Sequence, residues 1–266
     1  MIFKNKLFVV LVLILIVAGG ITLLFKQENV FEKSNNKKVI EDLSFTNLAV
    51  LTENAAVEII PTKDSVATVE YSGKTKKNKK FIFEADVKGD TLSVQFKEKR
   101  KGFIRFGITS LNLTLTVYLP ERQYERLQVE TDNGRIIAEQ LQATDLHLET
   151  DNGRIELKHV DAETVNVKTD NGKIVLENVT GQMKAKTDNG QISVVTSDLE
   201  DSLDLETDNG KIEIQTEKEP TNAVIDAKTD NGRVELFGQE NKHVTFGKGE
   251  NLIKLRTDNG RITVTK

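Results

Sequence analysis

Aspartate is the residue type whose spacing in this chain most directly suggests chemistry. It recurs in the tetrapeptide Thr-Asp-Asn-Gly (TDNG), which begins at Thr131, Thr150, Thr169, Thr187, Thr207, Thr229 and Thr257. Stacked carboxylates could bind calcium, but calcium takes about six to eight oxygen ligands and each repeat offers one carboxylate. We therefore favour turn-capping aspartates over divalent-cation binding, and we predict no metal site and no cofactor. The aspartates are Asp132, Asp151, Asp170, Asp188, Asp208, Asp230 and Asp258.

A cationic residue follows the glycine in every repeat except the fourth, where Gln191 takes its place. If the repeats stack, the aspartates become like charges about 5 Å apart, and they would repel one another. We expect the cationic column to relieve this repulsion. Its members are Arg135, Arg154, Lys173, Lys211, Arg233 and Arg261.

The insertion at residues 237–250 (FGQENKHVTFGKGE) is a second place where chemistry is conceivable, because it interrupts the repeat and carries Glu240 and His243. A polysaccharide-active enzyme would need such a unique set of residues. The three histidines of the chain do not share metal-ligand spacing, and no GxSxG, HExxH or P-loop motif occurs. We interpret the insertion as a loop or an extra hairpin, and we predict no catalytic residue.

The repeat also predicts the elements that carry these residues. Successive TDNG units are 19, 19, 18, 20, 22 and 28 residues apart, and apolar residues alternate around each turn, as in Leu127, Val129 and Ile136. Each unit therefore predicts two short strands and two turns, and the chain is predicted to be all-β. Asn-Gly between strands also signals a hairpin, so an antiparallel meander is one possibility. A parallel β-solenoid with rungs about 4.8 Å apart is favoured, because near-identical units gain most by stacking on their own copies.

Stacking would align the last two residues of each TDNG. The asparagine side chains would form an amide ladder in which each satisfies its neighbour. The glycines are expected to take the left-handed conformation, which a β-carbon disfavours. The asparagines are Asn133, Asn152, Asn171, Asn189, Asn209, Asn231 and Asn259. The glycines are Gly134, Gly153, Gly172, Gly190, Gly210, Gly232 and Gly260.

Composition excludes several classes of protein. The chain has no cysteine, which excludes disulfides, a cysteine nucleophile and a lipid-modified cysteine. Residues 1–125 carry 19 Lys/Arg against 14 Asp/Glu, and residues 126–266 carry 18 against 27, so the halves have charges of +5 and −9. The acidic repeats lack aromatic stacking platforms, which argues against nucleic-acid binding.

Two basic clusters lie in the first half of the chain. They are either solvated loops or contacts for anionic lipid headgroups or anionic cell-wall polymers, which attract such clusters over a Debye length. The residues are Lys74, Lys76, Lys77, Lys79, Lys80, Lys97, Lys99, Arg100, Lys101 and Arg105.

Residues 7–25 (LFVVLVLILIVAGGITLLF) carry no charge and are long enough to form one transmembrane helix of roughly 28 Å. Residues 17–19 (VAG) resemble a signal-peptide cleavage site, but the apolar run continues to Phe25, so an uncleaved anchor is favoured. The lysine count slightly favours a cytoplasmic body. A short N-terminal tail normally stays in the cytoplasm, however, so we expect a single-pass cell-membrane protein with an extracytoplasmic body.

The chain is expected to comprise an anchor at residues 1–25, a polar linker at 26–45 and one β-solenoid domain at 46–266. Residues 46–125 would form irregular rungs and residues 126–266 the regular TDNG rungs. A diverged eighth rung is expected to begin near residue 46, because the segment 48–59 aligns position for position with 127–138.

The runs LAVLTENAAVEIIP, GDTLSVQF and LTVYLPERQYERLQVETDNGRI, followed by the TDNG turns, resemble the bacterial putative-adhesin domain family, a β-solenoid domain of uncharacterised function. With its N-terminal anchor, the whole chain is similar to LiaG-type proteins, which are associated with the Lia cell-envelope stress locus of Gram-positive bacteria. The resemblance covers residues 40–266, implies extracytoplasmic exposure and association with envelope stress, and supplies no catalytic or ligand residues.

From these observations together we expect a non-enzymatic scaffold or adhesin-like binding surface of the bacterial cell envelope. Its partners would be the membrane it spans and a cell-wall polymer, an anionic lipid or a partner membrane protein. The alternatives are a solenoid enzyme that acts on polysaccharides and a repeat protein that binds divalent cations.

Overall fold

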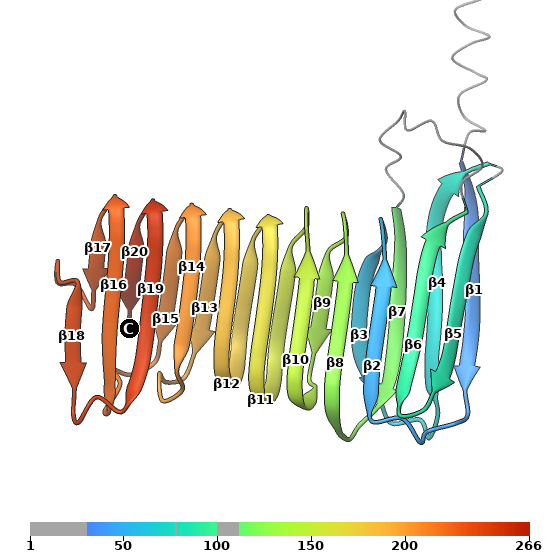
Figure 1. Ribbon diagram of the computed structural model, residues 1–266, viewed down its shortest axis with the longest axis horizontal. Coiled ribbons are helices and arrows are strands. Elements are labelled where there is room, and N and C mark those ends of the chain that lie inside the picture. Colours follow the sequence, from blue (N-terminus) through green and yellow to red (C-terminus); the bar gives the residue numbers. More distant parts are fainter. Residues whose placement is uncertain (1–30, 78, 100–111) are drawn as a thin grey trace, which may run out of the picture.

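The computed structural model describes residues 31–77, 79–99 and 112–266, which form a single sheet of twenty strands wound into an elongated stack (Figure 1). The first ten strands are β1 (Phe31–Ile40), β2 (Asn47–Thr52), β3 (Ala56–Thr62), β4 (Ala67–Lys76), β5 (Phe81–Lys88), β6 (Thr91–Glu98), β7 (Asn112–Pro120), β8 (Gln123–Thr131), β9 (Ile136–Glu139) and β10 (Gln142–Thr150). The remainder are β11 (Ile155–Asn171), β12 (Ile174–Asn189), β13 (Ile192–Thr196), β14 (Leu203–Asn209), β15 (Ile212–Thr216), β16 (Ala223–Asn231), β17 (Val234–Leu236), β18 (His243–Phe246), β19 (Asn251–Asn259) and β20 (Ile262–Thr265). These residues contain no helix, so the all-β prediction is confirmed for them.

Neighbouring TDNG units pair in parallel. β8, β10 and β11 place Thr131, Thr150 and Thr169 at one level, and β11 and β12 place Thr169 beside Thr187. An antiparallel meander is therefore wrong for this part of the chain. The sheet as a whole is mixed, because antiparallel pairs occur at both ends of the stack.

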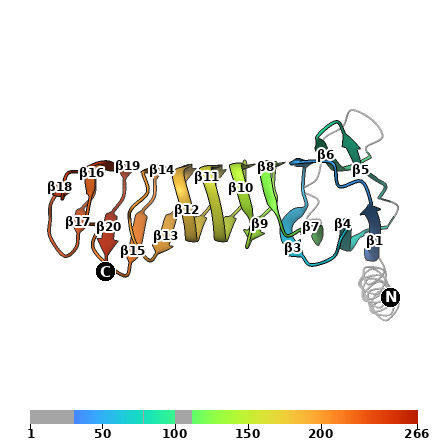
Figure 2. The same cartoon turned by 90° about the horizontal axis from the view of Figure 1, so that it is seen from below.

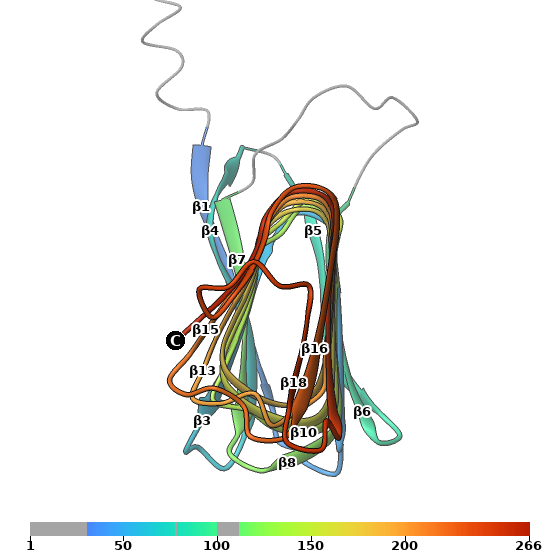
Figure 3. The ribbon, with the colours of Figure 1, turned by 90° about the vertical axis from the view of Figure 1, so that its left-hand side faces the viewer.

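Each rung has one strand that leads into the TDNG turn and one that leaves it. In the view along the stack, the rungs overlie one another as a flattened loop (Figure 3), and the view from below shows the two layers of strands (Figure 2). The inward residues of both strands fill the space between the layers; Leu146, Leu148, Ile155 and Leu157 are fully buried. Burial of each such side chain contributes roughly 1.5–3 kcal/mol. The two-residue alternation of the sequence thus becomes an apolar inside and a polar outside.

The rungs do not follow chain order at either end. The diverged rung, β2 with β3, lies between the rung of β8 with β9 and the strands β6 and β7. At the other end, β19 and β20 lie between β14 with β15 and β16 with β17. The C-terminal segment is therefore inserted inside the outermost rung, and residues 237–250 supply the chain that returns to this position.

Antiparallel strands cover the core at both ends. At the C-terminal end, β18 pairs with β16, and Phe237 and Phe246 pack against the core. At the N-terminal end, β5 pairs with β6, and β4 pairs with both β7 and β1. Tyr71 bridges these two layers, with ring centroids 5.0 Å from Phe83 and 4.6 Å from Phe96. These aromatic rings fill the wide end of the stack.

The expected linker at residues 26–45 is wrong in its described part. Residues 31–40 form β1, which pairs along its whole length with β4. The polar sequence of this strand fits an edge position, because most of its residues are exposed. The predicted anchor at 1–25 and residues 26–30 lie outside the described residues. Within the described part of the chain, no helix has the length and apolarity needed to cross a membrane.

Candidate functional site

The TDNG turns stack along one side of the molecule, which we call the TDNG edge. There the Nδ2 atom of each asparagine donates a hydrogen bond to Oδ1 of the asparagine in the adjacent rung, at 3.0 or 3.1 Å. The ladder runs through Asn54, Asn133, Asn152, Asn171, Asn189, Asn209, Asn259 and Asn231. Every side-chain oxygen of the ladder except that of Asn231 accepts a hydrogen bond from the asparagine of a neighbouring rung. These bonds hold adjacent rungs together.

The TDNG glycines are not in the left-handed conformation, which corrects the sequence-based expectation. Glycine is required here by close approach of the stacked backbones. A β-carbon on Gly172 would lie 1.7 Å from the carbonyl oxygen of Gly153, and the corresponding distances at the other six TDNG glycines are 1.6–2.0 Å. The same carbonyl accepts a hydrogen bond from the buried Thr169 hydroxyl at 3.1 Å.

Sequence reasoning missed this role of the threonines. Six of the seven TDNG threonines donate to the glycine carbonyl of the adjacent rung, at 3.0–3.2 Å. Thr131, whose adjacent rung has Ala55 in place of glycine, has no partner for its buried hydroxyl. The signal available in the sequence was that the first TDNG residue is both invariant and at an inward position of the alternation.

The left-handed conformation occurs instead at the corners opposite the TDNG edge. Gln140, His159 and Asn178 have φ of 55°, 51° and 51°. The pairing of β9 with β11 and of β11 with β12 places these residues in successive rungs. We call this side the opposite edge. It is where the leaving strand of one rung connects to the leading strand of the next.

The cationic column does not act mainly on the aspartates. Arg154 Nε lies 2.7 Å from Glu156 Oε1, and Arg135 Nη2 lies 3.8 Å from Glu58 Oε1. Lys211 and Arg233 also contact glutamates. Asp170 and Asp230 instead lie 3.8 Å from lysines of their own leading strands, Lys168 and Lys228. For Arg135, Arg154 and Lys211 the physical reason is the strand alternation, which points the residue after the glycine toward outward glutamates on the leaving strands, whereas the partner of Arg233 lies in the insertion.

The geometry does not assemble a cation site on the TDNG edge. One carboxylate per rung projects from it, and the ladder occupies the neighbouring amide oxygens. No group of three or more His, Asp or Glu side chains suited to a metal ion occurs among the described residues.

Ion pairs between rungs link the outward face of the leading strands. Lys168 Nζ lies 2.8 Å from Glu149 Oε1, and Lys186 Nζ lies 2.7 Å from Glu206 Oε1. The hydrogen bond from Lys186 lowers the pKa of Glu206, and the bond to Glu206 raises the pKa of Lys186. The same shifts occur for Glu149 and Lys168. This face is therefore a mixed-charge surface.

The insertion does not bring its polar residues into one constellation. Glu240 lies 3.4 Å from Arg233, whereas His243 Nδ1 lies 3.9 Å from Asp226. Both side chains are more than 60% exposed. The segment continues into β18 and packs its two phenylalanines on the end of the core, so its observed contacts are those of a cap.

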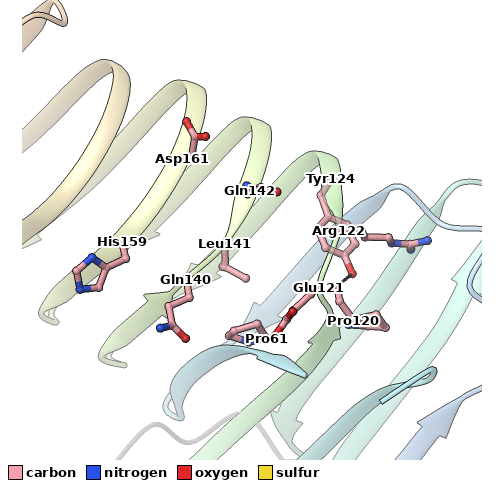
Figure 4. A pocket seen from close by; sticks show the side chains of 10 residues that line it. All are labelled: Pro61, Pro120, Glu121, Arg122, Tyr124, Gln140, Leu141, Gln142, His159 and Asp161. Carbon is pink, nitrogen blue, oxygen red and sulfur yellow. Dashed lines mark hydrogen bonds between the residues drawn. The ribbon is translucent and has the colours of Figure 1, made fainter. Parts of the chain in front are cut away.

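A hollow of about 460 Å³ lies on the opposite edge (Figure 4). At its rim the rings of Phe45 and Tyr124 stack with centroids 6.2 Å apart, and the Arg122 guanidinium contacts both, 4.9 Å from each ring centroid. It also donates hydrogen bonds to the carbonyl oxygens of Leu43 and Phe45. Arg122 thus fastens the segment before β2 to the stack. No sequence pattern predicts this contact, because Arg122 is separated from Phe45 by 77 positions and from Leu43 by 79.

The described members of the two basic clusters lie together, at the side of the molecule where the TDNG turns lie. Lys74 and Lys76 end β4, Lys79 and Lys80 precede β5, and Lys97 lies near the end of β6. Lys79 forms an ion pair with Glu98. The exposed lysines here, together with one from β1, are Lys33, Lys74, Lys76, Lys77, Lys80 and Lys99, and we call this surface the basic tip. Arg100, Lys101 and Arg105 lie outside the described residues.

Comparison with known proteins gives a family. A family model described as Toastrack DUF4097 matches residues 45–177 and 163–265. No curated protein matches the chain. Similar solved structures include a putative cell adhesion protein from Clostridium sporogenes, with a TM-score of 0.41, 13% identity and coverage of 88% of this chain and 99% of that one. Putative adhesins from Bacteroides fragilis (TM-score 0.45, 14% identity, coverage 88% and 97%) and Parabacteroides distasonis (0.38, 10%, 87% and 97%) are also similar.

Proposed function

Because the chain belongs to the Toastrack DUF4097 family, we propose that it is a non-enzymatic, adhesin-like binding scaffold of the bacterial cell envelope. In this proposal residues 7–25 span the cell membrane once, and the β-stack is extracytoplasmic, as in a LiaG-like protein linked to the envelope stress response. The names of similar solved structures, which are a putative cell adhesion protein and putative adhesins, agree with this proposal.

The proposal is supported by the hydrogen bonds that the polar side chains of the repeat make. The TDNG asparagines and threonines form hydrogen bonds with the adjacent rung, and these bonds hold the stack together. The outward face of the leading strands and the outward face of the leaving strands both stay exposed. A rigid, elongated body with polar faces suits presentation of a binding surface to a wall polymer or to a partner membrane protein.

The test is photo-crosslinking in intact cells with the full chain. A photoreactive residue replaces Lys184 on the outward face of the leading strands, or Gln215 on the outward face of the leaving strands; both are exposed. We expect covalent adducts with an envelope component from at least one face. Recovery of no envelope component from either position would contradict the proposal.

The enzymatic alternative has its own test. Purified chain incubated with cell-wall polymer is expected to leave the polymer intact. Breakdown of the polymer that is abolished by Glu240→Gln together with His243→Asn would make the scaffold assignment wrong.

A further inference from the structure

The described chain begins on the TDNG side of the molecule. β3 and β9 run away from the TDNG turns, β7 is parallel to β3, β4 is antiparallel to β7, and β1 is antiparallel to β4. β1 therefore starts on this side, where Phe31 pairs with Lys76. Figure 1 shows the beginning of β1 at the same side of the stack as the arrowheads of β8, β12 and β16.

The basic tip projects beyond the TDNG turns. Thr114 is level with Ala56, the first residue after the turn of the diverged rung, and Ser72 pairs with Thr114. Lys76 lies four residues farther along β4, which is roughly 13 Å at the rise of a strand. The aromatic packing of Tyr71, Phe83 and Phe96 supports the strands below it. Phe31, which is 51% exposed, adds an apolar side chain at the tip.

The two long edges differ in charge. The described segments 31–33, 74–77, 79–81 and 97–99 at the tip carry eight lysines against two glutamates. The rest of the TDNG edge carries the seven TDNG aspartates and the six cationic residues that follow the glycines. The corners of the opposite edge at 139–142, 158–163, 177–181, 196–202, 216–222 and 246–250 carry ten Asp/Glu against three Lys. The molecule is thus positive at the tip and acidic on the opposite edge.

We propose that the basic tip docks on anionic lipid headgroups of the bilayer that holds the chain, with the TDNG edge toward the membrane and the acidic opposite edge away from it. This inference rests on the proposed anchoring by residues 7–25. Phe25 and Phe31 are six residues apart, so the tip lies within about 20 Å of the hydrocarbon boundary even if this connection is fully extended. The headgroup layer and the Debye length, about 8 Å at physiological salt, cover much of that distance. An anionic surface attracts the tip and repels the opposite edge, which fixes the orientation.

The experiment uses full-length chain in vesicles of phosphatidylcholine with phosphatidylglycerol, and in vesicles of phosphatidylcholine alone. The chain has no cysteine, so a single Asp151→Cys or Glu163→Cys carries one fluorophore, on the TDNG edge or on the opposite edge. The two edges are separated by a strand of nine residues, roughly 30 Å. We expect severalfold more efficient energy transfer to acceptor-labelled headgroups from position 151 than from position 163 in the anionic vesicles.

Two matched variants test whether the basic tip causes the difference in energy transfer. Replacing Lys74, Lys76, Lys77 and Lys80 by Gln should largely remove the difference between the two positions, as should high salt or omission of phosphatidylglycerol. Replacing four exposed lysines elsewhere, Lys63, Lys218, Lys242 and Lys248, changes the net charge equally and should preserve the difference. Equal transfer from both positions, or equal loss in both variants, would overturn the inference while leaving the anchoring intact. Release of the chain from the vesicles by alkaline extraction would overturn the anchoring as well.

Discussion

Replacement of Gly172 by alanine should destabilise the stack far more than a methyl group normally does. The new β-carbon would lie 1.7 Å from the Gly153 carbonyl oxygen, whereas ordinary contact begins near 3.4 Å, so the rungs must separate locally by about 1.7 Å. That movement breaks the backbone bonds from Asn171 N to Asp151 O at 2.8 Å and from Ile155 N to Lys173 O at 2.9 Å. At about 0.5–1.5 kcal/mol for each bond, with the Thr169 bond also weakened, the loss is roughly 2–4 kcal/mol.

The assay is chemical unfolding followed by circular dichroism, with Ala55→Gly as the control. Ala55 takes the glycine position in the diverged rung, whose other neighbour is β6 and not a TDNG turn. Glycine there should cost only about 0.5–1 kcal/mol, the usual penalty relative to alanine in a strand. If Gly172→Ala unfolds at the same denaturant concentration as the parent chain, close backbone approach is not the reason for the glycine.

Three further outcomes are expected. Asn171→Ala removes two ladder bonds and should cost about 1–3 kcal/mol in unfolding experiments. Asn231→Ala removes the single bond of the terminal member and should cost about half as much, and equal losses would contradict the hydrogen-bond ladder. Glu206→Gln should lower the melting temperature slightly at pH 7. The hydrogen bond from Lys186 lowers the pKa of Glu206 from its ordinary 4.5, so the stabilisation is fully present above 4.5 and is lost as the pH falls through the lowered pKa. A difference that persists after Glu206 is protonated would exclude the ion pair with Lys186 as its cause. Calcium should leave the melting temperature unchanged, since one carboxylate per rung supplies too few ligands, and a concentration-dependent rise would show that the aspartates bind it.

The repeat made the rung predictable, because each TDNG unit contains its own alternation, turn and stacking residues. Local spacing was enough to place Asn133 beside Asn152 and Thr150 beside Thr169. The conformation of the glycines was not predictable in the same way. A turn context suggests positive φ, whereas the constraint on Gly172 arises from the carbonyl of another rung and is visible only once the interstrand distance is known.

The structure at the ends of the stack could not be predicted from local sequence patterns either, because it depends on contacts between distant segments. The polar composition of residues 31–40 is that of a linker and equally that of an edge strand, and only the exposed edge of β4 decides between them. The insertion of β19 between β14 and β16 depends on which apolar faces remain uncovered after the other rungs have formed. Contacts such as Arg122 with Phe45 join segments with no shared pattern, so periodicity carries no information about them.

In the proposed function the β-stack is held outside the cell by the N-terminal segment of the same chain. This topology can be tested by labelling full-length Glu163→Cys in intact cells with a membrane-impermeant maleimide, followed by alkaline extraction of the membranes. We expect labelling before lysis and retention of the labelled chain in the extracted membrane. Labelling only after lysis, or release of the chain by extraction, would contradict it.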